Sequence, residues 1–207
     1  MTGERNDQLE RALRRGNARP GAEEAARAAA RLSERLAAEG LADVVYAPVE
    51  SPLGTLLAAS TRKGLVRLAF PEEDVDAVLE ALARRVSPRI VEAPAPLERV
   101  RRELEEYFAG SRRAFELAQD WRLMGAFARR VLEATYAIPY GEVSSYGEVA
   151  GEAGSARGSR AAGNALGANP LPIVVPCHRV LRAGGALGGY AGGPERKRWL
   201  LELEGAV

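Results

Sequence analysis

The 207-residue chain contains very little cysteine or histidine, with one of each. A single cysteine cannot form an internal disulfide, and one cysteine with one histidine cannot build the usual four-ligand zinc site. We therefore expect no bound metal and no other cofactor. Long apolar runs are also absent: no stretch approaches the roughly 18 apolar residues of a membrane span, and the N-terminus is charged from its first turn. These absences argue against secretion and membrane insertion and predict a cytoplasmic protein.

Lysine is scarce as well, since nearly all of the positive charge is arginine and the only lysines are Lys63 and Lys197. Arginine is the better fork-shaped phosphate ligand, although a coding bias would give the same composition. The net charge of +1 decides nothing about nucleic acid, because a local basic patch suffices for binding. With 46% hydrophobic and 28% charged residues, the chain has the ordinary composition of a globular protein with one good core or two small ones.

The one cysteine and the one histidine are neighbours, Cys177 and His178, in the stretch NPLPIVVPCHRV. Random placement would make them adjacent roughly once in a hundred chains. A thiol beside an imidazole indicates nucleophilic chemistry, although a lone cysteine is more often a small buried apolar side chain. On an extended backbone, consecutive side chains point to opposite faces, so His178 should not bond Cys177 directly and a water should link them. The three prolines of the stretch predict a rigid extended segment in which IVV, residues 173–175, is a buried strand.

The N-terminal part of the chain predicts an α/β domain behind a helical extension. Residues 22–41 have the apolar spacing of a helix that Gly40 would end, and we assign no function to this extension, residues 1–43. From Val44 the sequence becomes β-rich, with turn signals that indicate two hairpins or three strands. Two amphipathic helices follow, EEDVDAVLEALARRV and PLERVRRELEEYFAG, on either side of a short strand near Ile90.

The C-terminal part predicts helices. The segment MGAFARRVLEATYAI has the pattern of a helix that Pro139 and Gly141 end. Two short helices follow in residues 141–170, the first capped by Ser144 and the second spanning about residues 156–168, and their spacing suits a helix-turn-helix. Glycine and alanine dominate the second helix, so that another surface can come close to it. That surface is either a nucleic acid or another helix of the protein, and the spacing alone does not decide between them.

The stretch PCHRV, followed by GGYAGGPERKRWLLELEG, resembles the active-site half of the O6-alkylguanine-DNA alkyltransferases, also called methylated-DNA-protein-cysteine methyltransferases. The resemblance extends back through IPYGEVSSYGEVA and SRAAGNALGANPLPIVVPCHRV, and more loosely to SPLGTLLAAS, so it covers about residues 44–205. It implies a ribonuclease H-like α/β domain, residues 44–118, and a mainly helical domain with the helix-turn-helix, residues 119–207. It also implies a monomer that binds double-stranded DNA through the minor groove. Such a protein transfers the alkyl group of O6-alkylguanine, and of O4-alkylthymine, irreversibly to its own cysteine.

The same resemblance assigns roles to residues at matching positions. Cys177 would be the nucleophile that takes the alkyl group, with His178 linked to it by water and Glu204 orienting His178. Asn169 would brace the turn that holds this segment. Arg160 would fill the base stack when the damaged nucleotide is flipped out. The remaining assignments are Tyr146 at the phosphate and the flipped guanine, Ala161 and Gly163 at the close approach to DNA, and Val180, Tyr190 and Ala191 around the base.

Two other functions fit parts of the sequence. An alkyltransferase-like protein that binds lesions without transfer would keep the helix-turn-helix and the arginine but would lack a reactive cysteine, and the presence of Cys177 argues against it. A papain-type cysteine hydrolase needs its histidine far along the chain from its cysteine, whereas His178 is adjacent. Some alkyltransferases carry zinc ligands in the first domain, and this chain has none there, so no metal dependence is expected.

Overall fold

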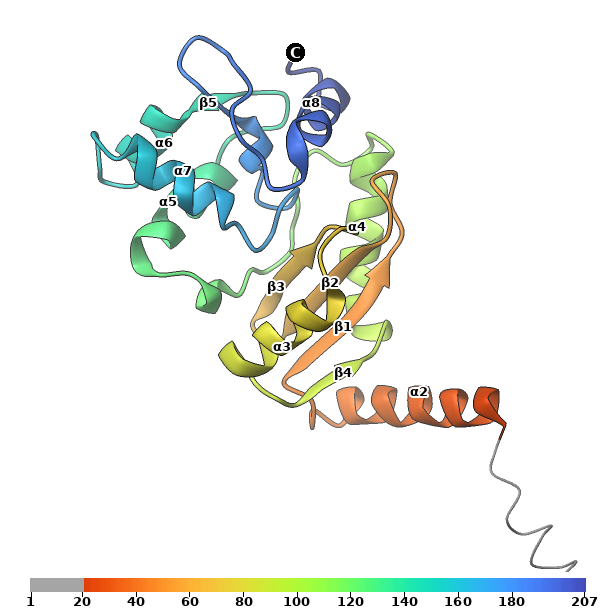
Figure 1. Cartoon of the computed structure of the whole chain (residues 1–207). Coiled ribbons are helices and arrows are strands. Elements are labelled where there is room, and N and C mark those ends of the chain that lie inside the picture. Colours follow the sequence, from red (N-terminus) through yellow and green to blue (C-terminus); the bar gives the residue numbers. More distant parts are fainter. Residues whose placement is uncertain (1–20) are drawn as a thin grey trace, which may run out of the picture.

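The computed structural model describes residues 21–207, which fold into a sheet-containing unit followed by a mainly helical unit (Figure 1). The predicted pair of helices around a strand near Ile90 is confirmed, and the alternative of three strands between residues 44 and 70 is correct. The elements of the first unit are strands β1 (Val44–Val49), β2 (Leu56–Thr61), β3 (Gly64–Ala69) and β4 (Ile90–Glu92), helices α3 (Val75–Arg85) and α4 (Glu98–Phe108), and the 3-10 helix η1 (Ala95–Leu97).

The four strands form one sheet in the order β3-β2-β1-β4, in which β1, β2 and β3 are antiparallel and β4 runs parallel to β1. Alternate residues of a strand face opposite sides of the sheet, and the two sides have different partners. Leu57 and Ala59 of β2 belong to a cluster with Val78 and Leu82 of α3. Leu56, one position earlier, belongs instead to the larger core that includes α4 and the helical unit. The alternation of side chains along β2 therefore packs one face of the sheet against α3 and the other face against the larger core.

The second unit is mainly helical, as the sequence predicts. It begins with the 3-10 helix η2 (Trp121–Leu123), and its short strands β5 (Ser144–Ser145) and β6 (Val180–Leu181) pair in parallel. Its other elements are α5 (Ala126–Tyr136), α6 (Tyr146–Glu152), α7 (Ser159–Gly167), the 3-10 helix η3 (Cys177–Arg179) and α8 (Gly193–Leu203).

The two short helices α6 and α7 begin at different residues from those predicted. Ser145, not Ser144, caps α6: its hydroxyl accepts from the Glu148 N–H, and the Glu148 carboxylate accepts from the Ser145 N–H at 2.7 Å. This reciprocal capping box selects one of two adjacent serines that composition alone does not distinguish. α7 begins at Ser159 rather than near residue 156, because the preceding residues form a turn in which the Gly158 N–H donates to the carbonyl of Ser155.

The predicted strand at residues 173–175 is wrong, although all three residues are buried. Ile173 has a φ of 73°, in the left-handed region that a strand does not contain. The chain turns at this point, and the Val175 N–H donates to the Leu171 carbonyl at 2.8 Å. The Asn169 side chain holds the turn from inside, accepting from the Leu171 N–H at 2.9 Å and donating to the Val175 carbonyl at 2.9 Å. The prolines lack the backbone N–H groups that a strand would need for its hydrogen bonds, and the Asn169 side chain makes hydrogen bonds to the backbone of the turn instead.

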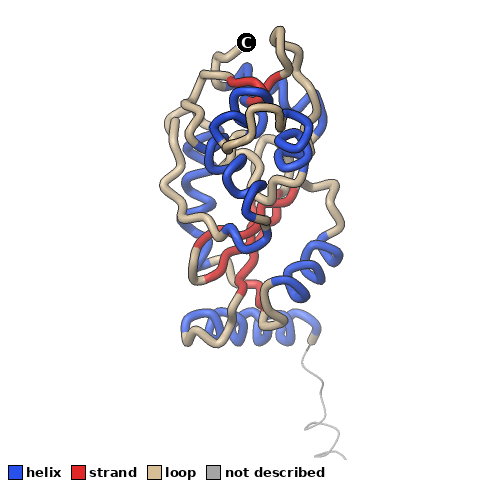
Figure 2. Tube along the Cα trace, turned by 90° about the vertical axis from the view of Figure 1, so that its left-hand side faces the viewer, coloured by secondary structure: helices blue, strands red, loops and turns tan. Residues whose placement is uncertain are grey.

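Helix α2 (Ala22–Ala38) precedes the sheet and lies beside the edge strand β4 (Figures 1 and 2). The predicted stop is confirmed, since Gly40 follows with a φ of 69°, which glycine adopts without strain. Residues 1–20 of the predicted extension lie outside the described residues. Within residues 21–207, no helix is both long enough and apolar enough to span a bilayer.

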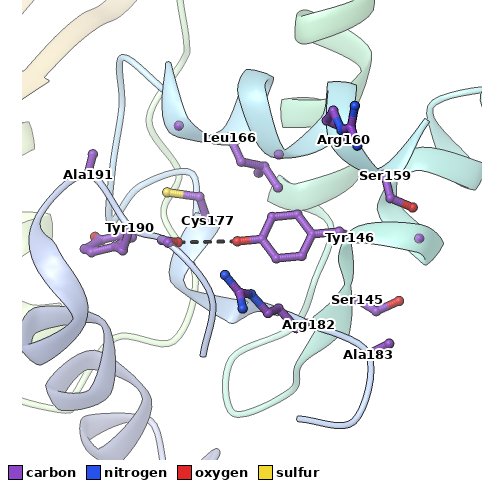
Figure 3. A pocket seen from close by; sticks show the side chains of 14 residues that line it. Ser145, Tyr146, Ser159, Arg160, Leu166, Cys177, Arg182, Ala183, Tyr190 and Ala191 are labelled. Atoms are coloured by element: carbon purple, nitrogen blue, oxygen red, sulfur yellow. Dashed lines mark hydrogen bonds between the residues drawn. The ribbon is translucent and has the colours of Figure 1, made fainter. Parts of the chain in front are cut away.

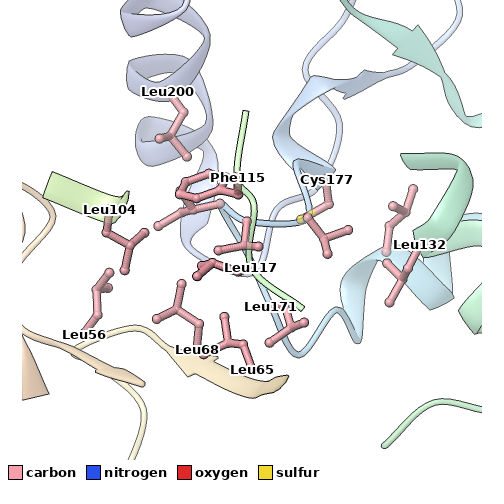
Figure 4. Close-up of a cluster of buried hydrophobic side chains, with 14 of the residues drawn as sticks. Leu56, Leu65, Leu68, Leu104, Phe115, Leu117, Leu132, Leu171, Cys177 and Leu200 are labelled. Carbon is pink, nitrogen blue, oxygen red and sulfur yellow. The ribbon is translucent and has the colours of Figure 1, made fainter. Parts of the chain in front are cut away.

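One apolar core joins the two units. Leu56, Leu65 and Leu104 of the first unit belong to the same buried cluster as Leu132 and Leu200 of the second (Figure 4). All five side chains are at most 2% exposed. Because interiors of this kind are packed as densely as organic crystals, a displacement of the sheet would be felt in the helical unit. Cys177 is a member of this shared cluster.

Candidate active site

A cavity of about 720 Å³ opens between α6, α7 and the loop after β6, and Cys177 lies on its wall (Figure 3). Tyr146 of α6 and Arg160 of α7 line it from one side, and Tyr190 and Ala191 of the loop line it from the other. The fold therefore brings to one place several residues that were predicted for the site and that lie far apart in the chain. A planar ligand of nucleobase size fits a cavity of this volume.

Cys177 begins the 3-10 helix η3 and is 5% exposed. The Nδ2 of Asn169 donates to its Sγ at 3.2 Å, so the asparagine that braces the preceding turn also contacts the sulfur. Burial raises the pKa of the Cys177 thiol to about 11, and the hydrogen bond from Asn169 and the charge of Lys197 only partly oppose this. At neutral pH the thiol is therefore protonated and needs a base before it can act as a nucleophile.

His178, the adjacent base, is fully buried and has different surroundings at its two nitrogens. Nε2 lies 2.9 Å from Oε1 of Glu204, whereas Nδ1 has no hydrogen-bond partner within the described residues. Burial holds the pKa of His178 below its usual range, although Glu204 opposes this, so the ring is neutral at pH 7. Because an ionised carboxylate only accepts hydrogen bonds, Nε2 carries the proton and Nδ1 presents a lone pair.

Glu204, at the end of α8, is a buried carboxylate with an arginine partner. Arg179 donates from Nε to Oε2 at 2.8 Å and from Nη2 to Oε1 at 2.9 Å, and its Nη1 donates to the Ile138 carbonyl at 2.6 Å. Burial alone would raise the pKa of Glu204, but the hydrogen bonds from His178 and Arg179 outweigh it and lower the pKa to about 2. The predicted contact between Glu204 and His178 is present, and Arg179 fixes the carboxylate in a bidentate geometry that the sequence did not indicate.

The low pKa of Glu204 predicts a loss of stability in acid. In the unfolded chain this carboxyl ionises near its ordinary pKa, so its contribution is complete above about pH 5 and is lost as the pH falls through about 2. We expect the free energy of unfolding to fall over this range by roughly 3 kcal/mol more in the unchanged protein than in E204Q. Denaturant unfolding at a series of pH values measures it. The exposed Glu202 of the same helix provides the control E202Q, and parallel pH curves for E204Q and the unchanged protein would contradict the prediction.

The surface beside the cavity combines close packing with one free side of α7. Ala162 and Ala165 are buried in the shared core, whereas Arg160 and Ala161 are exposed. A Cβ added at Gly163 would lie 3.7 Å from the ring of Tyr146, so the glycine packs against the tyrosine. The small residues of α7 thus serve helix packing on one side and leave an open approach on the other.

Three residues predicted to surround the base occupy different depths. Ala191 is exposed at the cavity rim, and the Tyr190 ring lies edge-on to His178 with centroids 6.3 Å apart. Val180 is fully buried and lies outside the cavity lining, and its carbonyl accepts from Nζ of Lys197 at 2.6 Å. Ala161 also lies outside the lining.

Several residues around the site were not identified from the sequence. Lys197, one of only two lysines, is fully buried, and burial lowers its pKa to about 8. The scarcity of lysine was the one feature of the sequence that could have drawn attention to this residue. Arg182 lines the cavity. Arg179 directly follows the Cys-His pair in the sequence, but nothing in the sequence indicated its contact with Glu204. Within residues 21–207, no group of three or more histidine, cysteine, aspartate or glutamate side chains could hold a metal ion.

The fold and the site define a two-domain protein with a cysteine, a histidine and a glutamate beneath an open cavity. Residues 44–120 match the family model of the ribonuclease-like domain of 6-O-methylguanine DNA methyltransferases, and residues 126–206 match that of their DNA-binding domain. A methylated-DNA–protein-cysteine methyltransferase of Mycobacterium tuberculosis is 40% identical over 159 residues, covering 77% of this chain and 91% of that protein. The constitutive enzyme of Bacillus subtilis is 39% identical over 163 residues, covering 77% and 94%. The chain belongs to the 6-O-methylguanine DNA methyltransferase family.

Solved structures agree with this assignment. The O6-methylguanine methyltransferase of M. tuberculosis matches with a TM-score of 0.69 at 39% identity, covering 79% of this chain and 93% of that chain. M. tuberculosis OGT in complex with DNA matches with a TM-score of 0.68 at 39% identity, covering 78% and 93%. The resemblance, the DNA repair function and the methyltransferase class predicted from the sequence are thereby confirmed, as are a ribonuclease-like first domain and a helical DNA-binding second domain.

Proposed function

We propose that this protein repairs O6-alkylguanine, and O4-alkylthymine, in double-stranded DNA by moving the alkyl group irreversibly to Cys177. The observation that carries the proposal is the arrangement of Cys177, His178 and Glu204, in which a buried thiol faces an open cavity and the neighbouring imidazole has its far nitrogen held by a carboxylate. The protein acts as a cytoplasmic monomer without cofactor. Its two domains are residues 44–118 and 119–207.

The first step is removal of the thiol proton. His178 Nδ1 accepts this proton through a bridging water, and the imidazolium that forms is stabilised by Glu204. Asn169 donates to the sulfur and favours the thiolate over the thiol, as does the positive charge of Lys197. These two groups offset only part of the effect of burial on the Cys177 pKa, so the thiol needs His178 as the proton acceptor.

The second step is displacement at the alkyl carbon. The thiolate forms a new S–C bond as the C–O bond to the base breaks, and the electron pair of that bond remains on the base. Tyr146, whose hydroxyl lies in the cavity near the Gly189 carbonyl, donates a hydrogen bond to the base as this charge develops. Tyr190 and the backbone of Ala191 close on the base. The product is a thioether, which has no good leaving group, so each molecule acts once.

Delivery of the base to the cavity is assigned to α6 and α7 acting as a helix-turn-helix. The exposed side of α7, with Arg160 and Ala161, enters the minor groove, where small side chains allow the backbone to approach the sugars and phosphates. The damaged nucleotide is flipped into the cavity, and Arg160 fills the space that it leaves.

Stoichiometry tests the proposed function. Titration of a fixed amount of protein with duplex DNA containing O6-methylguanine is expected to consume one lesion per protein molecule and then stop, because no second thiol is present to receive the group. Measurement of methyl groups lost from the DNA gives the end point. Continued turnover would show that the cysteine is regenerated, and binding without any loss of methyl groups would favour a lesion-binding protein.

A further inference from the structure

A residue of the ribonuclease-like domain reaches the carboxylate of the active site. Tyr107 lies on α4, and its hydroxyl donates to Oε1 of Glu204 at 2.6 Å, across 97 positions of the sequence. The same oxygen lies 2.9 Å from Nε2 of His178. The first domain therefore contributes a hydrogen-bond donor directly to the atom that orients the proposed base.

The position of the Tyr107 ring is closely determined. The side chain is fully buried, and its ring centroid lies 5.2 Å from that of Phe115 and 6.2 Å from that of Tyr140. A buried hydroxyl without a partner costs free energy, so this donor has a strong reason to remain on the carboxylate. The short contact is the only hydrogen bond found for the hydroxyl within the described residues.

We propose that Tyr107 is a positioning residue for alkyl transfer: its hydroxyl takes up part of the negative charge of Glu204, and through Glu204 it sets the basicity of His178. This inference rests on the proposed function, in which His178 accepts the proton of Cys177. It gives the ribonuclease-like domain a part in the chemistry, because that domain supplies one of the hydrogen-bond donors to Glu204.

The direction of the effect on the basicity of His178 follows from how the negative charge of Glu204 is divided among its hydrogen-bond donors. A carboxylate that accepts a strong hydrogen bond has less negative charge available to stabilise a nearby imidazolium. Arg179 donates twice to the same carboxylate, so removal of the Tyr107 hydroxyl leaves Glu204 oriented but makes it a stronger partner for His178. The other titratable groups near the pair are Cys177 on η3, Lys197 on α8, Tyr140 after α5 and Tyr190 on the loop, and none of them is altered by the change.

Y107F tests the proposal, because it removes the hydroxyl and keeps the ring. We expect the acidic limb of the pH profile for single-turnover transfer to move to higher pH by about half to one pH unit, since one net hydrogen bond is worth this much. The rate at the plateau should change by less than about threefold. Y136F is the matched control: the Tyr136 hydroxyl also donates at 2.6 Å, but to the Phe115 carbonyl, away from Glu204. Its profile should coincide with that of the unchanged protein.

The single histidine provides a second readout that does not require DNA. In tag-free protein labelled at histidine, one imidazole signal reports His178, and its titration should move to higher pH in Y107F and not in Y136F. Coincident His178 titrations and coincident pH profiles for Y107F and the unchanged protein would overturn the proposal. Absence of transfer in the unchanged protein would instead overturn the proposed function, which keeps the two failures distinct.

Discussion

Replacement of Cys177 with serine is expected to abolish alkyl transfer and to change DNA affinity by less than about threefold. A hydroxyl is far less acidic than a thiol, so His178 cannot generate the corresponding alkoxide, and the transfer rate should fall by roughly three orders of magnitude or more. DNA affinity should persist because the proposed DNA contacts are made by α6 and α7, and most of such binding energy comes from phosphates. Single-turnover rates and equilibrium binding at one salt concentration measure the two quantities.

The serine variant is expected to keep the local structure around position 177, so that its transfer rate can be compared with that of the unchanged protein. Serine is close to cysteine in size, and its oxygen can accept the hydrogen bond that Asn169 now donates to Sγ. Transfer by C177S at close to the unchanged rate would show that the nucleophile is another group. A parallel loss of DNA affinity would show that the substitution had disturbed the fold rather than the chemistry.

Arg160→Ala should slow repair of duplex DNA by one to two orders of magnitude, roughly 1.4 to 2.7 kcal/mol of lost stabilisation. Extrusion of a base from the stack costs a few kcal/mol, and an inserted guanidinium offsets part of that cost. Arg160 is exposed at the start of α7 and lines the cavity, as this role requires. Free O6-benzylguanine has no stack to leave, so the reaction with it should change by less than about threefold.

The comparison of substrates separates flipping from chemistry. R157A is a suitable control, because Arg157 is also an exposed arginine, lies in the turn before α7 and does not line the cavity. R157A should slow the repair of duplex DNA only by the contribution of a phosphate contact. Its rate losses on duplex DNA and on free O6-benzylguanine should therefore differ much less than those of Arg160→Ala. Equal losses on both substrates for Arg160→Ala would mean that Arg160 shapes the cavity, and no loss on duplex would mean that another residue fills the stack.

The parts of the site that could be predicted from the sequence are those that one contiguous pattern carries. Cys177, His178 and Asn169 lie within ten residues, and their roles depend on a local turn whose residues are all present in the motif. The amphipathic helices and the alternating strands were predicted for the same reason, since their periods are local. Glu204, distant in sequence, was one candidate carboxylate among many until the resemblance selected it, and the role of Asn169 was likewise assigned by the resemblance.

The rest depends on packing that no local pattern encodes. Tyr107 reaches Glu204 because α4 and α8 share one core, and nothing in its surroundings in the sequence marks it. The turn at Ile173 is a different case, because the side chain that makes it, Asn169, lies only four residues earlier and supplies contacts that a strand ladder would otherwise make. Arg179 contacts Glu204 only once the end of α8 is in place. Interactions between distant segments therefore account for most of what the sequence did not indicate.

The most direct test of alkyl transfer to Cys177 is the intact mass of the protein after a single turnover with duplex DNA containing O6-methylguanine. Each protein molecule is expected to gain one methyl group in place of one hydrogen, with the modified peptide containing Cys177, and the DNA is expected to lose the same number of methyl groups. An unchanged protein mass while the DNA loses its methyl groups, or a methyl group on any residue other than Cys177, would contradict this expectation.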